Sequence, residues 1–379
     1  MSNFTTKCIH ADDILNRVTD VVSPINVSTT FRYDNDNLTA SMEVSGLTES
    51  EQLPVYSRES HPNADRLETV LTSILGGFAV AYASGLSAYY AVLTHICPKR
   101  LFISDCYHGC QLAAKLFAKT SGMQILSFDE IETKCSMGDL VHVEDPSNPY
   151  GESSNVVELV KRVHKKRGLI LIDSTLAPPP LRNPWDLGVD IILHSGTKYL
   201  GGHSDLLSGV VCVDNAEQAV EMRKERMIMG TIPASLESFL LLRSLRTLEV
   251  RVRQQSANCL KLVKFLKEHA VEVPGVLASI RHASLQTDDY VKSQNKEGYS
   301  PVFSIILKEP AQCPKVIKEL HIFQHATSLG GVESLIEWRS LSDSSIDKAL
   351  LRISVGLENA QDLLADLFGA LKHVQGFDL

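Results

Sequence analysis

The stretch GLILIDSTLAPPPLRNPWDLGVDIILHSGTKYLGG (residues 168–202) contains two short apolar runs, each of which ends in polar residues. The first run ends at Asp173, and the second ends at Ser195, three residues before Lys198. Neither run alternates between apolar and polar residues, which is typical of parallel strands that helices cover on both faces. In an open sheet of this kind, ligands bind beyond the carboxyl ends of the strands. The stretch therefore predicts an α/β fold with a site at these strand ends.

The same alternation of apolar runs and helical patterns extends over much of the chain. We expect strands at 78–84, 100–105, 124–129, 140–146, 168–173, 190–195 and 209–213, and helices at 85–97, 110–122 and 155–168. An amphipathic helix begins near Asn63 or Asp65, either of which can cap it, and ends at glycines. These elements predict a mostly parallel central sheet between helices.

The chain becomes mostly helical after about residue 230. Residues 237–270 form one long helix or two, and a smaller α+β region follows, with strands at 300–307 and 350–356 and a helix at 359–374. We therefore divide the chain into an N-terminal arm (1–55), an α/β domain (56–245) and a C-terminal α+β domain (246–379). The arm lacks clear periodicity, so we expect it to be irregular and to lie on another surface.

Composition excludes several classes of protein. Hydrophobic residues make up 44% of the 379 residues, as in a globular chain, and the net charge is -8 without long basic runs. We expect no nucleic-acid partner and no membrane. The N-terminus lacks the apolar core of a signal peptide, and the eight cysteines form no CxxC pair, which favours the reducing cytoplasm. CYHGC (106–110) lacks a second ligand cluster at metal spacing, so we expect no metal.

Polar residues at the predicted strand ends are suited to one ligand. Gly85 and Leu86 open a helix whose free amides can hold a phosphate, and Tyr107 can stack on a flat ring. Asp173 can pair with a protonated ring nitrogen, and a desolvated Lys198 can form an imine with a carbonyl. Ser195 and Thr197 lie beside that lysine. The ligand that combines a phosphate, a pyridine ring and an aldehyde is pyridoxal 5'-phosphate (PLP).

Seven motifs, in the same order, extend this interpretation to nearly the whole chain. They are YSR (56–58), ASGL (83–86), DPSNP (145–149), IDST (172–175), SGTKYLGGHSD (195–205), SLGGVESL (328–335) and RISVGLE (352–358). With these motifs, the sequence resembles the PLP-dependent enzymes of cysteine and methionine metabolism, the group of cystathionine γ-synthase, γ-lyase and β-lyase. The resemblance implies the PLP-dependent transferase fold, aspartate aminotransferase-like or fold type I, with a smaller C-terminal α+β domain.

The resemblance also implies a role for each matching residue. Lys198 would carry the cofactor and move protons, Asp173 would pair with the ring nitrogen, and Tyr107 would stack on the ring and assist proton transfer. The remaining cofactor residues would be Thr175 near the ring, Ser195, Thr197, Gly85 and Leu86 at the phosphate, and Tyr56 and Arg58 at the phosphate of a neighbouring subunit. Asn148, Ser328 and Arg352 would bind the substrate, with Arg352 clamping its carboxylate. The arm would clasp a partner in a homo-oligomer, a catalytic dimer that forms a tetramer.

Five positions depart from the pattern of the family. His61 stands where asparagine is usual, His108 and Cys110 alter the run after Tyr107, and Leu112 lies about where several relatives carry an arginine. Thr327 stands where many γ-acting members carry glutamate. These changes predict an intact cofactor set and a less charged distal end of the substrate pocket. His61, His108 and His203 can each be structural residues.

The resemblance leaves three functions open. The first is a trans-sulfuration enzyme that cleaves a C–S bond of cystathionine or a related sulfur amino acid by β- or γ-elimination. The second is a γ-replacement transferase that joins cysteine to an O-acyl-homoserine. The third is a PLP-binding protein with little catalysis. In the first two cases the substrate is a small molecule.

Overall fold

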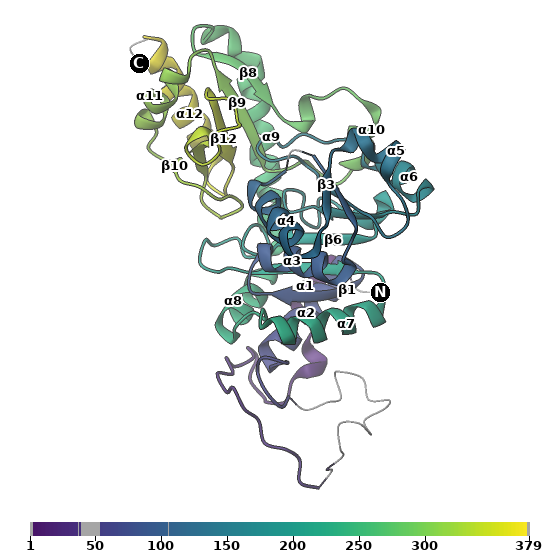
Figure 1. Ribbon diagram of the computed structural model, residues 1–379. Coiled ribbons are helices and arrows are strands. Elements are labelled where there is room, and N and C mark those ends of the chain that lie inside the picture. The colour runs from purple at the N-terminus through teal and green to yellow at the C-terminus, as the bar shows by residue number, and fades with distance from the viewer. Residues whose placement is uncertain (1–2, 37, 39–53, 105, 377–379) are drawn as a thin grey trace.

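The computed structural model describes residues 3–36, 38, 54–104 and 106–376, and it contains two β-sheets (Figure 1). The larger sheet has seven strands in the order β1-β7-β6-β5-β4-β2-β3. They are Phe78–Tyr82 (β1), Arg100–Ile103 (β2), Gln124–Leu126 (β3), Leu140–Glu144 (β4), Leu169–Asp173 (β5), Ile191–Ser195 (β6) and Gly209–Val213 (β7). All seven predicted strands are present. The sheet is parallel except that β7 is antiparallel to both of its neighbours.

Helices cover both faces of this sheet, and the strands are apolar on both faces for that reason. Residues of β5 show the alternation: Leu171 packs in one hydrophobic cluster, whereas Ile170 and Ile172 pack in another. The cluster around Leu171 includes residues of Gly85–Ile96 (α3), His108–Ser121 (α4) and Ala216–Met229 (α7). The opposite cluster includes residues of Phe4–His10 (α1), Pro62–Leu75 (α2), Val156–Lys165 (α6) and Ser235–Leu245 (α8).

The C-terminal part of the chain forms the second sheet, with five strands in the order β10-β11-β12-β9-β8. They are Leu277–Arg281 (β8), Val302–Leu307 (β9), Gln324–His325 (β10), Leu335–Trp338 (β11) and Leu350–Ser354 (β12). Leu248–His269 (α9), Cys313–Glu319 (α11) and Ala360–Gln375 (α12) contribute to its separate core, and Asp289–Gln294 (α10) and the short Ile131–Lys134 (α5) complete the helices named here. The sequence predicted β9, β12 and α12 but missed β8, β10 and β11. The 237–270 segment is two helices, α8 and α9. The domain boundaries remain a prediction.

The N-terminal segment differs from expectation at two points. Residues 4–10 form α1, whose buried Cys8 packs in the main core, although we expected the first 55 residues to be irregular. The cap of α2 is His61 rather than Asn63 or Asp65, because Nδ1 of His61 accepts from the amide of Ala64 at 3.3 Å. The Asn63 side chain instead holds the arm by binding the amide of Asn26 and the carbonyl of Pro24.

The described arm projects from the lower end of the molecule in Figure 1. Part of the SPINVSTTF stretch (23–31) is extended, and Thr30 forms an antiparallel bridge with Tyr56. Residues 37 and 39–53, which include SMEVSGLTESEQ, lie outside the described residues. Among the described helices, none is long and apolar enough to cross a membrane.

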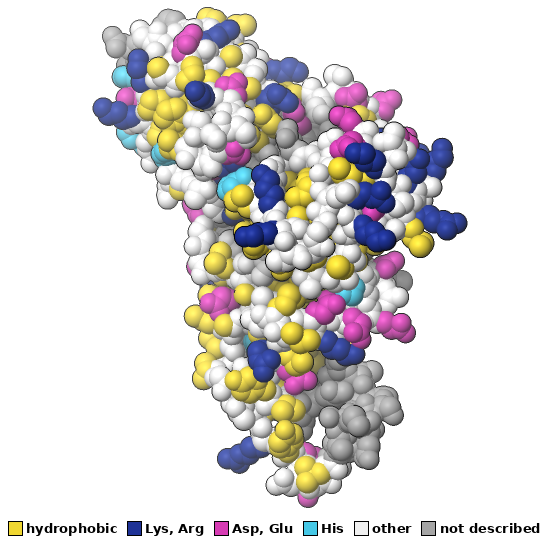
Figure 2. All heavy atoms as spheres, viewed as in Figure 1, with side chains coloured by type: hydrophobic (Ala, Val, Ile, Leu, Met, Phe, Trp, Pro, Cys, Tyr) yellow, Lys and Arg dark blue, Asp and Glu magenta, His cyan; other side chains and the backbone are white. Residues whose placement is uncertain are grey.

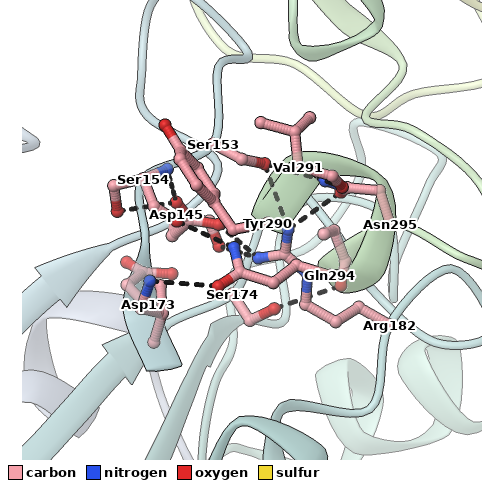
Figure 3. Close-up of polar contacts among 12 residues, drawn as sticks. Asp145, Ser153, Ser154, Asp173, Ser174, Arg182, Tyr290, Val291, Gln294 and Asn295 are labelled. Carbon is pink, nitrogen blue, oxygen red and sulfur yellow. Dashed lines mark hydrogen bonds and ion pairs between the residues drawn. The ribbon is translucent and has the colours of Figure 1, made fainter. Parts of the chain in front are cut away.

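A buried ion pair forms directly after β4, between Asp145 and Arg182, and a hydrogen bond from Arg182 to Asn295 connects it to the C-terminal part of the chain (Figure 3). The guanidinium of Arg182 lies between the carboxylate of Asp145 and the side-chain oxygen of Asn295, which follows α10. Nη1 of Arg182 also donates to the carbonyl of Asp145 at 3.0 Å, and Nη2 donates to Ser153. Both charged side chains are almost fully buried. Removal of one partner would therefore leave an uncompensated charge.

We expect Arg182→Met to lower the free energy of unfolding by about 3–5 kcal/mol, because Asp145 would stay buried without its cation. Chemical denaturation of the protein, followed by circular dichroism, measures this loss. Lys161→Met is the control, because Lys161 is exposed and 4.0 Å from Glu158, and it should change stability by less than about 0.5 kcal/mol. Equal effects of the two variants would contradict a structural role for the buried pair.

Candidate active site

A cavity of about 340 Å³ lies beyond the carboxyl ends of the central strands, and residues of the C-terminal part of the chain close one side of it. Most of the predicted site residues line it, namely Gly85, Leu86, Tyr107, Asn148, Asp173, Thr175, Ser195, Thr197, Lys198, Ser328 and Arg352. They come from seven separate segments of the sequence. The structure therefore brings the predicted cofactor and substrate residues into one site.

Lys198 lies in the turn after β6, largely buried, and a loop of the C-terminal part of the chain packs against it. Nζ of Lys198 donates to Oγ of Ser328 at 2.6 Å. Ser328 has a left-handed φ of 84°, and Gly330 has a φ of +85°. A Cβ at Gly330 would lie 2.8 Å from the amide nitrogen of Tyr199 and 3.0 Å from the carbonyl carbon of Lys198. The conformation of this loop thus brings its backbone against the lysine and the Ser328 hydroxyl to the amine.

The environment of Lys198 favours its neutral amine. Burial, together with the nearby positive charge of Arg352, lowers the pKa of Lys198 to about 8, against the opposing effect of Glu337. At pH 7 about a tenth of amines with this pKa are neutral, whereas far fewer are neutral for an ordinary lysine, whose pKa is about 10.4. A neutral amine is the form that attacks an aldehyde or accepts a proton from carbon.

The amino end of α3 faces the turn after β6 and forms a cradle for an anion. Oγ of Ser84 accepts from the amide of Ser87 at 3.1 Å, so a capping box fixes the first turn of the helix. The amides of Gly85 and Leu86 belong to the first turn, whose N–H groups have no intrahelical acceptor. A Cβ at Gly85 would lie 3.2 Å from Oγ of Ser195, so glycine permits this close approach. Amides and hydroxyls in this arrangement suit a phosphate.

Two buried carboxyl groups lie side by side at the ends of β4 and β5, where Glu144 is paired in register with Asp173. Burial raises the pKa of Asp173, although the amide of Thr175 donates to its Oδ1 at 3.0 Å. Burial, followed by repulsion from Asp173, raises the pKa of Glu144 to about 8. A protonated ring nitrogen beside Asp173 would supply the positive charge that this carboxylate lacks. The donors and acceptors of the cavity therefore fit PLP.

Tyr107 is the residue before α4, and its position depends on a glycine and on Glu144. The backbone amide of Tyr107 donates to Oε2 of Glu144 at 2.6 Å. A Cβ at Gly109 would lie 2.4 Å from Cε1 of the Tyr107 ring, so a larger residue there would displace the ring. The ring of His108 packs edge-on at 4.8 Å. The half-exposed tyrosine ring is thus placed at the wall of the cavity, where it can stack on a ligand.

Arg352 belongs to β12 and forms the opposite wall. Nη1 of Arg352 donates to Oδ1 of Asn148 at 3.0 Å, and Nη2 donates to the carbonyl of Ser328 and to Glu337, each at 2.5 Å. Glu337 faces Arg352 because their positions pair across β11 and β12. Burial lowers the pKa of Arg352 to about 10, and Glu337 opposes this shift, so the guanidinium stays charged at neutral pH. A buried, oriented guanidinium suits a carboxylate.

Tyr56 and Arg58 do not line this cavity. The side chain of Tyr56 is 44% exposed, and Nη1 of Arg58 donates to the carbonyl of Met227 at 3.1 Å. The two residues lie in contact, with the guanidinium of Arg58 5.5 Å from the centre of the Tyr56 ring. Their predicted role at the phosphate of a neighbouring subunit stays a prediction.

The positions that depart from the family pattern divide into two groups. Cys110 and Thr327 line the cavity. His61 is a buried helix cap whose Nε2 bonds to the carbonyl of Pro233, and burial lowers its pKa, so its role is structural. His203 bonds to the carbonyl of Gly201 and to Ser244. Leu112 is 59% exposed on α4 and is not part of the cavity wall.

Sequence reasoning missed two charged residues that line the cavity, Glu144 and Arg339, and it missed Glu337, which binds both arginines of the wall. Glu144 ends a predicted strand, which is the signal that could have found it. Glu337 and Arg339 lie on and after β11, a strand that the sequence did not predict. In the described chain, a group of potential metal ligands combines Cys110 with His142 and Asp173, and their ligand atoms lie within 4.8 Å of one another. Asp173 in that group belongs to the cofactor site.

Comparison with known proteins identifies the class. The model of the family "Cys/Met metabolism PLP-dependent enzyme" matches residues 5–372, so the chain belongs to this family. The chain is 31% identical to a cystathionine gamma-lyase of Dictyostelium discoideum, with 97% of each chain covered. It is also 31% identical to a cystathionine beta-lyase of Lactococcus lactis subsp. cremoris, over 98% of this chain and 100% of the relative.

A solved structure with a similar fold is that of cystathionine gamma synthase from Xanthomonas oryzae pv. oryzae in complex with aminoacrylate and cysteine. The TM-score is 0.87 at 26% identity, and 99% of each chain is covered. These comparisons confirm the predicted family, the PLP-dependent transferase fold and the dependence on PLP.

The lowered pKa of Lys198 predicts how the apoprotein takes up its cofactor. The rate of PLP incorporation should rise with pH and reach half of its maximum near pH 8, because the neutral amine reacts and the pKa is about 8. Stopped-flow measurements of visible absorbance at a series of pH values test this. Nα-acetyl-lysine is the control, with its midpoint near about 10.4. A midpoint for the protein close to that of the control would contradict the assignment.

Proposed function

We propose that this protein is a PLP-dependent carbon–sulfur lyase that cleaves a C–S bond of cystathionine or a related sulfur amino acid. The observation that carries the proposal is a single cavity that holds a buried lysine, a buried aspartate and a carboxylate-binding arginine: Lys198, Asp173 and Arg352. The names of the two curated relatives, a γ-lyase and a β-lyase, support elimination as the reaction. A γ-replacement that joins cysteine to an O-acyl-homoserine is the second candidate, because the Xanthomonas structure is that of a γ-synthase.

The residues of the cavity have separate roles. Arg352, together with Asn148 and Ser328, holds the α-carboxylate of the substrate and so fixes the orientation of the α-carbon. The hydroxyls of Ser195 and Thr197 and the amides of Gly85 and Leu86 hold the phosphate, and Tyr107 and Thr175 fix the ring. PLP, when bound, supplies an electron sink for a carbanion at the α-carbon. Asp173 keeps the ring nitrogen protonated, which strengthens that sink.

Lys198 is the base. Its Nζ removes the proton from the α-carbon, which is sufficient for loss of a sulfur group from the β-carbon. For a γ-elimination, a proton must also be removed from the β-carbon before the sulfur group leaves from the γ-carbon, and Nζ would be the base for this second removal as well. Ser328 holds Nζ at 2.6 Å, so the amine stays near the α-carbon when it is free. Tyr107, at the wall of the same cavity, assists proton transfer to the leaving sulfur.

Lys198→Ala should lower C–S cleavage by at least about 10²–10⁴-fold, because it removes both the cofactor anchor and the base. Release of keto acid from cystathionine, cysteine and methionine, in parallel with formation of cystathionine from cysteine and O-acyl-homoserines, is the measurement. Lys161→Ala, which changes an exposed lysine, is the control. Wild-type holoenzyme that releases no keto acid but forms cystathionine would favour the second candidate. A change in absorbance on adding amino acids, without any product, would favour a cofactor-binding protein.

We also propose that the arm clasps a second copy of the chain and that the enzyme is a homo-oligomer, with a dimer as the catalytic unit and a tetramer as the assembly. Apolar side chains of the arm are exposed: Val21 fully, Ile14 by 87% and Val27 by 82%. Figure 2 shows exposed hydrophobic side chains at this end of the molecule. A row of exposed apolar residues on one segment is typical of an interface. Tyr56 and Arg58, which end the arm, would then reach the phosphate of the partner.

Replacing Val21 and Val27 with aspartate should break this assembly and reduce PLP affinity together, because the partner would lose its Tyr56 and Arg58. Light scattering after size exclusion gives the mass, and equilibrium dialysis gives the affinity. Val250→Asp, at a position that is 64% exposed on α9, is the control and should change neither quantity. An unchanged mass with the arm substituted would contradict the proposed clasp.

The cysteines support a reducing compartment, and we propose the cytoplasm. None of the eight cysteines, all of which lie in the described residues, forms a disulfide, and six of them are buried. Cysteines in this number without disulfides are typical of proteins that are not exposed to an oxidising environment.

A further inference from the structure

The C-terminal wall of the cavity contains a second arginine, Arg339, that none of the roles above uses. It lies directly after β11, two residues beyond Glu337, and is 4% exposed. It lines the same cavity as Arg352, Thr327 and Ser328. Its Nη1 donates to Oε1 of Glu337 at 3.2 Å. Glu337 therefore lies between two guanidinium groups, those of Arg352 and Arg339.

One edge of the Arg339 guanidinium is occupied, and the other lacks a close hydrogen-bond acceptor among the described residues. Nη1 is held by Glu337 and by Oγ of Ser342 at 3.1 Å. Nε is buried and has no acceptor among the described residues. For Nη2, the contact that the described residues provide is Oδ2 of Asp343, at 3.9 Å. Nε and Nη2 together form the side-on fork of a guanidinium, which matches the two oxygens of a carboxylate.

Burial makes this open edge informative. A buried N–H group without an acceptor is destabilising, so such groups in native proteins usually have a partner or await one. Arg182 and Arg226 also have a buried Nε without an acceptor in the described chain, but neither of them lines the cavity. Arg339 combines the open edge with a position in the wall of the substrate site.

The charges of this wall favour an additional anion. Arg352 and Arg339 carry two positive charges, and Glu337, whose pKa is lowered by Arg352 and Arg339 against the effect of burial, carries one negative charge. Glu144 has a pKa raised to about 8 and does not compensate them at neutral pH. The α-carboxylate of the substrate neutralises the remaining charge. A second amino-acid group of the substrate is a zwitterion, with a carboxylate beside an ammonium. It can then bind without changing the net charge of the site.

The position of Arg339 suits the far end of a bound substrate. Asp343, four residues after Arg339, has its Oδ2 3.9 Å from Nη2 of Arg339. Arg339, Arg352 and Tyr107 all line this cavity, and Glu337 contacts both guanidinium groups. Arg339 therefore supplies a cationic group in addition to Arg352, which would hold the α-carboxylate.

We infer that Arg339 is a specificity-determining residue that binds the distal carboxylate of a substrate with an amino-acid group at each end, with Asp343 beside it for the distal ammonium. The inference rests on the proposed function and narrows its substrate class. Small thioethers such as methionine, which have the same homocysteine part and no distal carboxylate, would bind without this contact.

Cystathionine and methionine form a matched pair for the test, because they differ only in the group on sulfur. We expect Arg339→Met to raise the half-saturating concentration of cystathionine by about 10- to 100-fold, the usual cost of a charge-assisted hydrogen bond, and to leave that of methionine within about 2-fold. The measurement is the change in visible absorbance of the PLP-loaded holoenzyme on titration, which does not require turnover. KM and kcat for keto acid release are measured beside it.

Two further variants keep the test decisive. Arg339→Lys retains the charge beside Glu337, so it should fold even if Arg339→Met does not. Because lysine lacks the planar fork, this variant should bind cystathionine several-fold more weakly and methionine as the wild type does. Arg253→Met, at an exposed position paired with Glu249 on α9, is the control and should bind both ligands as the wild type does.

Each result decides between the alternatives. Weaker binding of cystathionine, with unchanged binding of methionine, supports the inference. Equal weakening of both ligands would overturn it, because Arg339 would then act only through Glu337 and Arg352, and unchanged binding of both would overturn it as well. Failure of the wild-type holoenzyme to respond to any sulfur amino acid would instead overturn the proposed function.

Discussion

The burial of Lys198 without a carboxylate in hydrogen-bonding contact among the described residues is the constraint on which the site depends. An amine in this position loses hydration, and its pKa falls to about 8. Its polar contact is with the neutral hydroxyl of Ser328. A carboxylate in contact would restore the charge on the amine and make it a weak nucleophile. The fold keeps the nearest carboxylate of the C-terminal wall, Glu337, engaged with arginines instead.

The acidic groups of the cavity follow from that constraint. Asp173 and Glu144 lie at adjacent strand ends, and their mutual repulsion adds to the cost of burying them. The cost of burying Asp173 falls when a protonated ring nitrogen lies beside it. Glu144 accepts a hydrogen bond from the amide of Tyr107. Glu144 therefore links the carboxyl pair to Tyr107, which would stack on the ring. The charged residues that line the cavity are separated, with the carboxyl groups at the ends of β4 and β5 and the arginines on and near the strands of the second sheet.

The sequence predicted that Asp173 and Lys198 would lie in one site because both are close to the ends of strands with strong patterns. Asp173 ends one apolar run, Lys198 lies three residues after the end of another, and the topology of a parallel sheet brings such strand ends together. Glu337 and Arg339 were missed because β11 has only four residues. The residue that pairs in register with Glu337 is Arg352, which belongs to a different strand, β12. The cap of α2 was misassigned because Asn63, a good cap by type, binds the arm instead. In each of these cases, contacts between different segments of the chain determined the structure more than local propensity did.

The two walls also differ in how freely they can change. The cofactor wall is fixed by close contacts: a side chain at Gly85 would press on Ser195, and one at Gly109 would overlap Tyr107. The substrate wall is formed by β12 and by the turn after β11, where Arg339 and Asp343 lie in a short helical turn and the chain that follows it. Apart from the buried Arg339, residues 340–348 of this connection are partly or fully exposed, and exposed connections tolerate substitution better than a packed sheet does. A change of substrate could therefore arise in residues 340–348 while the register of Arg352 with Glu337 keeps Arg352 in place as the proposed carboxylate clamp, so the affinity for cofactor and the choice of substrate would be separable in this fold.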